Sequence, residues 1–260
     1  MKTLRLLFIA LVLSASAQVS AQTADEILAN YFENTGGVEA WQSLEGMQMS
    51  AKINQGGMEI PLEIVSLKSG KQMTTINFQG KQIKQGVFNG EVLWSTNFMT
   101  QKAEKGDQET TDNMKRQMND FPDPFLNYQK NGYSVELVGT ETIDGAETFK
   151  IKLTKTPVLV DGIEEENVSF YFFDTENFVP LVVQSEIKAG PMKGQVSEVK
   201  MSDYQEIGDV ILPYSLTQGL KGQPGQVIAI DKIELNPQID DKEFEFPEEE
   251  TVENPEAEIK

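Results

Sequence analysis

The side chains best able to do chemistry in this sequence are carboxylates, because the chain contains no His and no Cys. Their absence removes the commonest general base, the cysteine nucleophile and the usual zinc ligands. The densest acidic group is the DGIEEEN segment at 161–167. Its oxygens could bind Ca²⁺, but it lacks the alternating oxygen pattern of a calcium loop and is more typical of a solvated acidic loop. We therefore predict no metal and no cofactor.

Motifs for nucleophilic or nucleotide chemistry are also missing: there is no GxSxG, no P-loop and no GxGxxG after a predicted strand. Paired carboxylates for glycoside cleavage would meet only in the folded chain. A hydrolase acting on a lipid or polysaccharide is therefore the hypothesis we rank last, since no nucleophile–base pair is visible. We predict that the protein is not an enzyme.

The apolar side chains indicate binding instead. Methionine is flexible and polarisable, and it suits surfaces that accept varied apolar shapes. Any single methionine is more typical of ordinary core, but as a set they favour a soft apolar cavity. Aromatic side chains in and before a mid-chain insert could line the same space. The methionines are Met47, Met49, Met58, Met73, Met99, Met114 and Met118, and the others are Trp94, Phe98, Phe121, Phe125 and Leu126.

The N-terminus has the pattern of a secretory signal peptide. A basic start with Lys2 and Arg5 precedes a short apolar run at 6–13, and VSA at 19–21 is a small-x-small cleavage signal. We expect a signal peptide over 1–21, a mature chain from Gln22, and a periplasmic protein without a lipid anchor, since it has no Cys. Losing Lys2 and Arg5 takes the formal charge from −19 to −21.

This acidity makes nucleic acid an improbable partner, and it disfavours anionic headgroups through simple electrostatics. The last residues are rich in Glu and Pro, so we expect an acidic disordered tail over 248–260 that serves solubility. One domain is expected over 22–247, because no Pro/Gly/Ser linker divides the chain.

A helix is predicted at the start of the mature chain. Thr23 and Glu26 form a capping box, an apolar stripe follows, and the Gly36–Gly37 pair ends the helix. A second helical turn carries Trp41. The segment at 99–132 interrupts the later strands: it has helical spacing at Met114 and Met118, and a further helix is expected before Gly132.

Strands dominate the rest of the chain. Segments of alternating polarity are separated by turn residues such as Asn89-Gly90 and Asp144-Gly145, and about eleven antiparallel strands result. In the hairpin SFYFFDTENFVPLVVQ at 169–184, Phe170 and Phe172 point to one face, and Tyr171 and Phe173 point to the other. Both faces are apolar, so both must be covered. We expect helices, not a second sheet, to cover one of them.

Three segments carry a resemblance to a known family. They are YFFDTENFVPLVVQSEI at 171–187, VKMSDYQEIGDVILPYSLTQ at 199–218 and IDKIELNPQIDDKEFEFPE at 230–248. With the opening helix that ends in Gly-Gly, these segments resemble the periplasmic outer-membrane lipoprotein-carrier superfamily (LolA/LolB-like). The similarity spans nearly all of 24–247.

The resemblance implies a mainly β fold with a helical lid: a single curved antiparallel sheet of about eleven strands, forming an unclosed half-barrel over helices. It also implies a hollow that binds acyl chains. The residues expected to line it are Met49, Ile53, Leu62, Phe78, Trp94, Phe98, Phe125, Phe170 and Phe172, and those expected in the lid are Met114, Arg116 and Met118.

The resemblance implies a carrier that takes the acyl chains of lipoproteins, or other lipids, to the outer membrane. Inner- and outer-membrane lipoprotein-handling proteins are candidate partners, and we expect a monomer. The family's carrier latches its lid with a strand arginine, whereas the sole arginine of this mature chain is Arg116, in the insert. A non-enzymatic envelope interaction module, with the same fold and a filled cavity, is the alternative.

Overall fold

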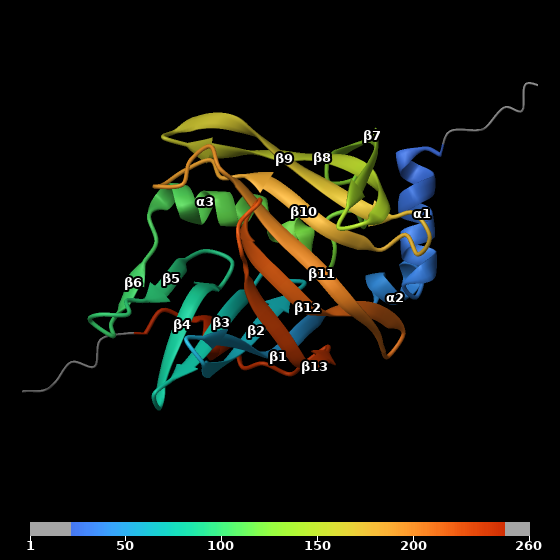
Figure 1. The fold of residues 1–260 in the computed structure, drawn as a ribbon. Helices are drawn as coiled ribbons and strands as arrows, with labels where there is room; N and C mark the ends of the chain where they lie inside the picture. Colours follow the sequence, from blue (N-terminus) through green and yellow to red (C-terminus); the bar gives the residue numbers. More distant parts are fainter. Residues whose placement is uncertain (1–21, 248–260) are drawn as a thin grey trace, which may run out of the picture.

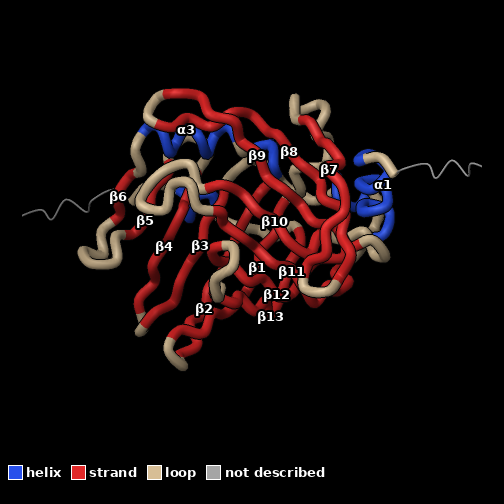
Figure 2. Tube along the Cα trace, turned by 45° about the horizontal axis from the view of Figure 1, so that its top comes forward, coloured by secondary structure: helices blue, strands red, loops and turns tan. Residues whose placement is uncertain are grey.

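The computed structural model describes residues 22–247, and in them thirteen strands form one antiparallel sheet that does not close on itself (Figures 1 and 2). The signal peptide expected over 1–21 and the tail expected over 248–260 lie outside the described residues. The first six strands are β1 (Gly46–Gln55), β2 (Met58–Leu67), β3 (Gln72–Phe78), β4 (Lys81–Phe88), β5 (Leu93–Thr96) and β6 (Ala103–Lys105). The other seven are β7 (Ser134–Ile143), β8 (Ala146–Val160), β9 (Ile163–Asp174), β10 (Pro180–Glu186), β11 (Val196–Ile207), β12 (Val210–Leu220) and β13 (Gln226–Leu235).

The two edge strands of the sheet come from the middle of the sequence. From edge to edge the order is β6-β5-β4-β3-β2-β1-β13-β12-β11-β10-β9-β8-β7. The first and last strands, β1 and β13, are therefore neighbours at the centre and pair from Met47↔Leu235 to Ile53↔Ile228. The two edge strands, β6 and β7, are consecutive in sequence, so the segment between them joins the two edges of the sheet.

The described chain has few helices, and the first begins as the sequence predicts. Helix α1 (Ala24–Asn34) begins with the predicted capping box, in which the side chains of Thr23 and Glu26 each accept the other's backbone N–H. Helix α2 (Val38–Gln42) follows at once. Helix α3 (Gln108–Arg116) and the 3₁₀ turn η1 (Met118–Asp120) lie in the mid-chain insert, and a second turn, η2 (Asp241–Phe244), follows the last strand. None of these described helices is both long and apolar enough to cross a membrane.

The concave face of the sheet carries the main hydrophobic core. The apolar stripe of α1 (Ile27, Leu28, Tyr31 and Phe32) is buried against it, as the sequence predicts. The segment at 121–133 fills the space beside α1 with Phe125, whose ring meets that of Phe173 at 5.6 Å. Inward-facing strand residues complete this core, among them Met47, Ala51, Leu62, Ile151, Leu153, Val210, Leu212, Ile230 and Ile233.

The convex face has a smaller core under the C-terminal segment. Phe244 of η2 is completely buried against Val65, Met73 and Val87, which are side chains of β2, β3 and β4. Trp94 completes this cluster and donates its indole N–H to the carbonyl oxygen of Phe244 at 3.0 Å. The chain after β13 therefore acts as a clamp on the outer face, and it lies far in sequence from the strands that it covers.

Two details differ from the sequence predictions. The sheet has thirteen strands, not about eleven, in part because the short β6 lies within the predicted mid-chain break. The helix predicted before Gly132 is absent, since 121–133 is a series of turns. Pro122 and Pro124 supply no backbone N–H there, and Asn127 has a left-handed backbone (φ 65°), which a helix cannot contain.

Replacing the clamp residue tests the outer core. Phe244→Ala should lower the free energy of unfolding by about 3–5 kcal/mol, because it removes a fully buried aromatic ring and leaves a cavity. Phe98→Ala, at an exposed position, should change it by less than about 0.5 kcal/mol. Urea titration followed by circular dichroism measures both. Similar losses in the two variants would show that η2 does not stabilise the sheet.

Candidate ligand-binding cavity

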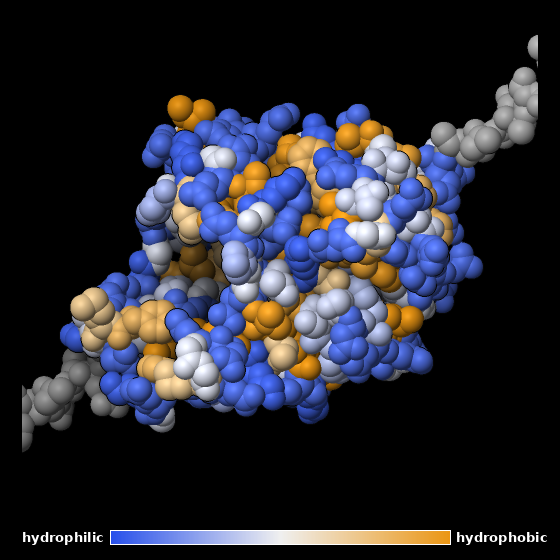
Figure 3. Space-filling view, viewed as in Figure 1, coloured by the Kyte–Doolittle hydropathy of each residue, from blue (hydrophilic) through white to orange (hydrophobic). Residues whose placement is uncertain are grey.

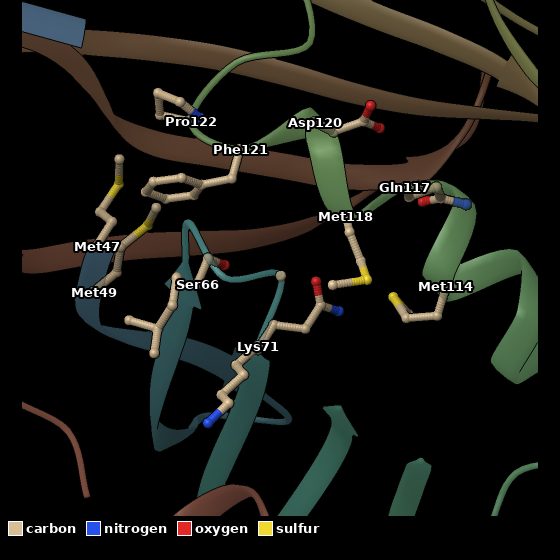
Figure 4. A pocket seen from close by; sticks show the side chains of 13 residues that line it. Met47, Met49, Ser66, Lys71, Met114, Gln117, Met118, Asp120, Phe121 and Pro122 are labelled. Atoms are coloured by element: carbon tan, nitrogen blue, oxygen red, sulfur yellow. The ribbon is translucent and has the colours of Figure 1, made fainter. Parts of the chain in front are cut away.

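A cavity of about 260 Å³ lies between the concave face of the sheet and the insert. We call α3 and η1 the lid. The floor comes from β1 and from the β2–β3 turn, and the roof comes from the lid and the residues that follow it (Figure 4). The lining residues are Met47, Met49, Ser66, Leu67, Gly70, Lys71, Gln72, Met114, Gln117, Met118, Asp120, Phe121 and Pro122.

Four methionines from opposite sides face this cavity. Met47 and Met49 come from β1, at positions two apart and therefore on the same face of the strand. Met114 and Met118 come from the lid at a spacing of four, which places them on one side of consecutive helical turns. Figure 4 shows the ring of Phe121 pointing toward Met47 and Met49. The apolar part of the wall is therefore mainly flexible thioethers with one aromatic ring, which can adapt to an apolar chain, and Ser66, Lys71, Gln72, Gln117 and Asp120 form the polar part.

The charged groups near the cavity are paired. Lys71 bonds to Asp241 at 2.6 Å, and its ammonium group lies 5.9 Å from the ring centre of Phe244, on the outer side of the sheet. Asp120 accepts the hydroxyl of Tyr133 at 2.8 Å and the ammonium of Lys155. Neither group is free to anchor a ligand strongly, so the cavity selects mainly by shape and apolarity.

One side of α3 is hydrogen-bonded to the end of the β8–β9 hairpin. Asn113 both donates to the carbonyl oxygen of Leu159 (2.8 Å) and accepts its N–H (2.7 Å). The Glu109 carboxylate accepts the turn N–H groups of Asp161 and Gly162 at 3.1 and 2.6 Å. The acidic cluster at 161–167 thus includes the turn whose backbone N–H groups donate to Glu109 of the lid. In the described residues, 22–247, no group of three or more acidic side chains could hold a metal ion.

Arg116 extends this contact by a further turn of α3. Its guanidinium donates to the carbonyl oxygen of Pro157 at 2.8 Å and to Glu164 at 2.9 Å. Glu109, Asn113 and Arg116 are spaced by four and three residues, so they form one stripe along the helix. Arg116 therefore reaches the β8–β9 hairpin from the lid side.

The opposite side of the lid has only van der Waals contact with the sheet. Within the described part of the chain, no hydrogen bond or ion pair joins α3 or η1 to strands β1–β6. Met118 instead lies directly on Gly70 in the β2–β3 turn, where an added Cβ would come within 2.7 Å of the Met118 side chain. The lid is therefore hydrogen-bonded along β8–β9, whereas its contacts with β5 and with the β2–β3 turn involve no hydrogen bond or ion pair within the described residues.

The residues that follow the lid are fixed to α1 by a partly buried carboxylate. Asp123 accepts the hydroxyl of Tyr31 at 2.9 Å and the N–H of Phe125 at 2.8 Å. Burial raises the pKa of Asp123 to about 6, with a smaller contribution from nearby Asp120, against the lowering effect of its two hydrogen bonds. Burial likewise raises the pKa of Tyr31, so its hydroxyl stays protonated and keeps donating.

The predicted lining residues divide into those on the concave face and those elsewhere. Met49 lines the cavity, and Ile53 lies four residues further along β1 on the same face. Phe78 shares its face of β3 with Ile76, which packs against the concave core. Leu62 and Phe125 are buried within that core and do not line the cavity. Met114, Arg116 and Met118 are all in the lid, as expected.

Four other predicted lining residues lie away from the cavity. Trp94 belongs to the convex cluster under Phe244. Phe98 is at the exposed tip of the β5–β6 hairpin. Phe170 and Phe172 lie on the convex face, where the ammonium of Lys150 is 5.1 and 5.2 Å from their ring centres. It is Tyr171 and Phe173 that face the concave core, next to Phe125.

The list of expected lining residues omitted Met47, although Met47 lies two positions from Met49 on the same face of β1, so the alternation of the strand would have included it. It also missed Gly70, Gln117 and Asp120. Only the glycine left a signal, since Gly70 has a positive φ of 85° in a tight turn. Its role against Met118 depends on a contact between segments about fifty residues apart.

The raised pKa of Asp123 predicts a dependence of stability on pH. The folded-state pKa of about 6 lies above the ordinary value of 3.8, so between these values the unfolded chain gives up the proton first. The free energy of unfolding should therefore fall as the pH rises from about 4 to about 6. The side chain in Asp123→Asn cannot ionise. The melting temperature of this variant minus that of the wild type should therefore be larger at about pH 7 than at about pH 5.

Thermal melts of both proteins at the two pH values measure this difference. Asp231→Asn, at an exposed position on β13, is the matched control and should track the wild type at both values. A constant difference between Asp123→Asn and the wild type would contradict the assignment.

Comparison with known proteins shows the fold. No protein-family model matches the chain, and no curated protein matches it. Among solved structures, a LolA superfamily protein from Nitrosomonas europaea superposes with a TM-score of 0.51 at 16% identity, covering 86% of this chain and 98% of that chain. A DUF1329 family protein from Desulfovibrio piger superposes with a TM-score of 0.50 at 13% identity, covering 84% and 97%.

Each superposition covers more than four fifths of this chain, well beyond the three segments that carried the sequence resemblance. The unclosed antiparallel sheet, the helix α1 on its concave face and the lid between its edges agree with that resemblance. This chain has a LolA-like fold.

Proposed function

We propose that the protein is a periplasmic carrier that holds an acyl chain of a lipoprotein, or of another lipid, in the cavity under the lid. The observation that carries this proposal is the lid itself: it closes a cavity lined by methionine and is bonded to the sheet along one side only. Transfer to the outer membrane, with membrane proteins that supply and accept the cargo, is the corresponding role. Such a transfer forms and breaks no covalent bond, so it needs no catalytic group.

The cavity is too small for a long acyl chain while the lid is closed, which supports a lid that moves. Pockets for small ligands usually have volumes of about 300–1,000 Å³, and this one has about 260 Å³. A long acyl chain therefore requires the lid to swing outward. The attachment along β8–β9 can serve as the hinge side, because the contact between Met118 and Gly70 breaks no hydrogen bond when it opens.

The energetics suit a carrier that must also release its cargo. Burial of an acyl chain gains roughly 0.8 kcal/mol per CH₂, so a long chain could gain on the order of 10 kcal/mol. The charged groups nearest the cavity are already paired, so they add little binding energy. Displacing the lid offsets part of the gain, which lowers the affinity enough for transfer.

A specific observation also favours the interaction module with a filled cavity. Much of the concave face is already covered by the protein's own side chains, with Tyr31, Phe32 and Phe125 packed onto Phe173 and its neighbours. If the lid does not move, the fold is closed to any long ligand. The two proposals differ in whether the protein contains lipid.

Native mass spectrometry separates them. We expect the mature chain, purified from a periplasmic extract without detergent, to carry a lipid or an acylated peptide at near-unit stoichiometry, which organic extraction would identify. An apo mass, together with no uptake of added fatty acid, would reject the carrier and favour the interaction module.

A charge placed in the cavity should prevent uptake. Met49→Glu puts a carboxylate on the floor, where its desolvation opposes an apolar ligand, and we expect at least a tenfold loss of affinity for a fluorescent C16 fatty acid. Met99→Glu makes the same change at a side chain that is 94% exposed and should bind like the wild type. Circular dichroism confirms the fold of each variant. Equal affinity in the two variants would place the ligand elsewhere.

The attachment of the lid should control the rate of exchange. Arg116→Ala removes the bonds to Pro157 and Glu164, which are partly exposed, so we expect the bound probe to dissociate about three- to tenfold faster. Lys115→Ala is the matched control, because within residues 22–247 Lys115 pairs only with Asp112 of the same helix. Stopped-flow displacement measures both rates. Equal rates would mean that Arg116 does not hold the lid.

A further inference from the structure

One end of the sheet gathers a set of hairpin tips that the cavity does not use. Because consecutive strands are antiparallel, alternate connections lie at opposite ends. We call the end away from α1 the distal rim. It comprises the connections at 54–58, 79–81, 97–102, 161–163, 187–195 and 221–227. Helix α1 marks the other end, where Asn34 donates to the carbonyl oxygen of Asn177 in the β9–β10 turn.

Exposed apolar side chains concentrate on the distal rim. Eight large hydrophobic residues of the described chain are exposed, and six of them belong to this rim: Met58, Phe98, Met99, Ile163, Met192 and Val227. Ile163 is 68% exposed and Met99 94%. The tips of the β5–β6, β8–β9 and β10–β11 connections are all on the left side of Figure 1, and Figure 3 shows apolar residues protruding there. Such side chains at loop tips cost solubility and indicate an interaction surface.

The charge of the rim is opposite to that of the protein. The whole chain has a formal net charge of −19. The distal rim nevertheless contains five lysines and a single acid, which are Lys81, Lys102, Lys188, Lys193, Lys221 and Asp161. The turns at the other end contain four acids, Glu91, Asp144, Glu176 and Asp209, against two lysines, Lys68 and Lys71, which are both paired with carboxylates. On the rim, Lys188 and Lys193 pair with Glu165 and Glu186 beside the tips, whereas Lys81, Lys102 and Lys221 form no ion pair within the described residues.

Apolar tips flanked by lysines match one kind of partner in particular. At a bilayer surface, apolar side chains enter the boundary between headgroups and acyl chains, and each nearby lysine is attracted to anionic headgroups. The Debye length at physiological salt is about 8 Å, so the rim lysines act at the surface while most of the distant acidic groups are screened. The overall acidity therefore does not prevent contact through this end.

We propose that the distal rim binds the surface of an anionic phospholipid bilayer. The contact is made by Phe98, Met99 and Met192, with the rim lysines on the headgroups. This goes beyond the proposed carrier function, because the surface lies outside the cavity and needs no cargo to act. A protein partner would also cover apolar tips, but it would not bind in response to lipid charge alone.

Vesicle flotation tests the apolar tips. The purified mature chain should float with vesicles of phosphatidylglycerol and phosphatidylethanolamine, and at least tenfold less with pure phosphatidylcholine. Phe98→Ser combined with Met99→Ser should weaken binding to the anionic vesicles at least tenfold. Val38→Ser combined with Val138→Ser is the matched control, because both valines are exposed but lie off the rim. Absence of flotation with anionic vesicles, or an equal loss in the control, would overturn the proposal.

A second pair of variants tests the lysines. Lys102→Gln with Lys193→Gln should weaken binding to anionic vesicles about tenfold, whereas Lys68→Gln with Lys232→Gln, away from the rim, should not. Uptake of the free fluorescent fatty acid should be normal in all four double variants, so a failure of the carrier proposal and a failure of this one give different results. Binding that ignores the headgroup charge, or the same loss in both lysine pairs, would refute the bilayer contact.

Discussion

The two edge strands of the sheet do not pair with each other, and the architecture around the cavity depends on that gap. A sheet closed between β6 and β7 would leave no gap between its edges for the insert to cross. Here the edges stay apart, and the segment that joins them carries the lid. The covering element is thus fixed by topology, because the chain must pass from one edge to the other across the opening. The lid needs no separate domain and no disulfide to stay in place.

The lid is attached more strongly on one side than on the other, so it should open from the side that lies on the β2–β3 turn. Polar bonds from Glu109, Asn113 and Arg116 hold it to β8–β9, whereas Met118 touches Gly70 through carbon and sulfur atoms alone. Hydrogen bonds depend on geometry and dispersion contacts tolerate change, so the weaker side separates first. A thioether cavity bounded on one side by such a contact can widen gradually. A rigid aromatic wall would admit only one ligand shape.

Local signals in the sequence predicted the elements, and contacts between distant segments determined the site. The capping box of α1, the hairpin turns and the helical spacing of Met114 and Met118 depend on neighbouring residues, so the sequence shows them directly. The phase of a strand with two apolar faces is different. Nothing local tells that Phe173, and not Phe172, faces the concave core, or that Trp94 packs under a residue 150 positions later. Of the nine predicted lining residues, only Met49 is among those that line the cavity, and four lie on the convex face or at an exposed hairpin tip.

The pairing of β1 with β13 also has a consequence for how the chain folds. These strands are at the centre of the sheet, and the register Met47↔Leu235 joins residues nearly the whole described chain apart. Contacts of such sequence separation require a large loop-closure entropy before they give any stability, and they slow folding. The two halves of the sheet can form hairpins early, but neither half has its central neighbour until the last strand is available. We expect folding to be late and cooperative, with the C-terminal strand completing the sheet.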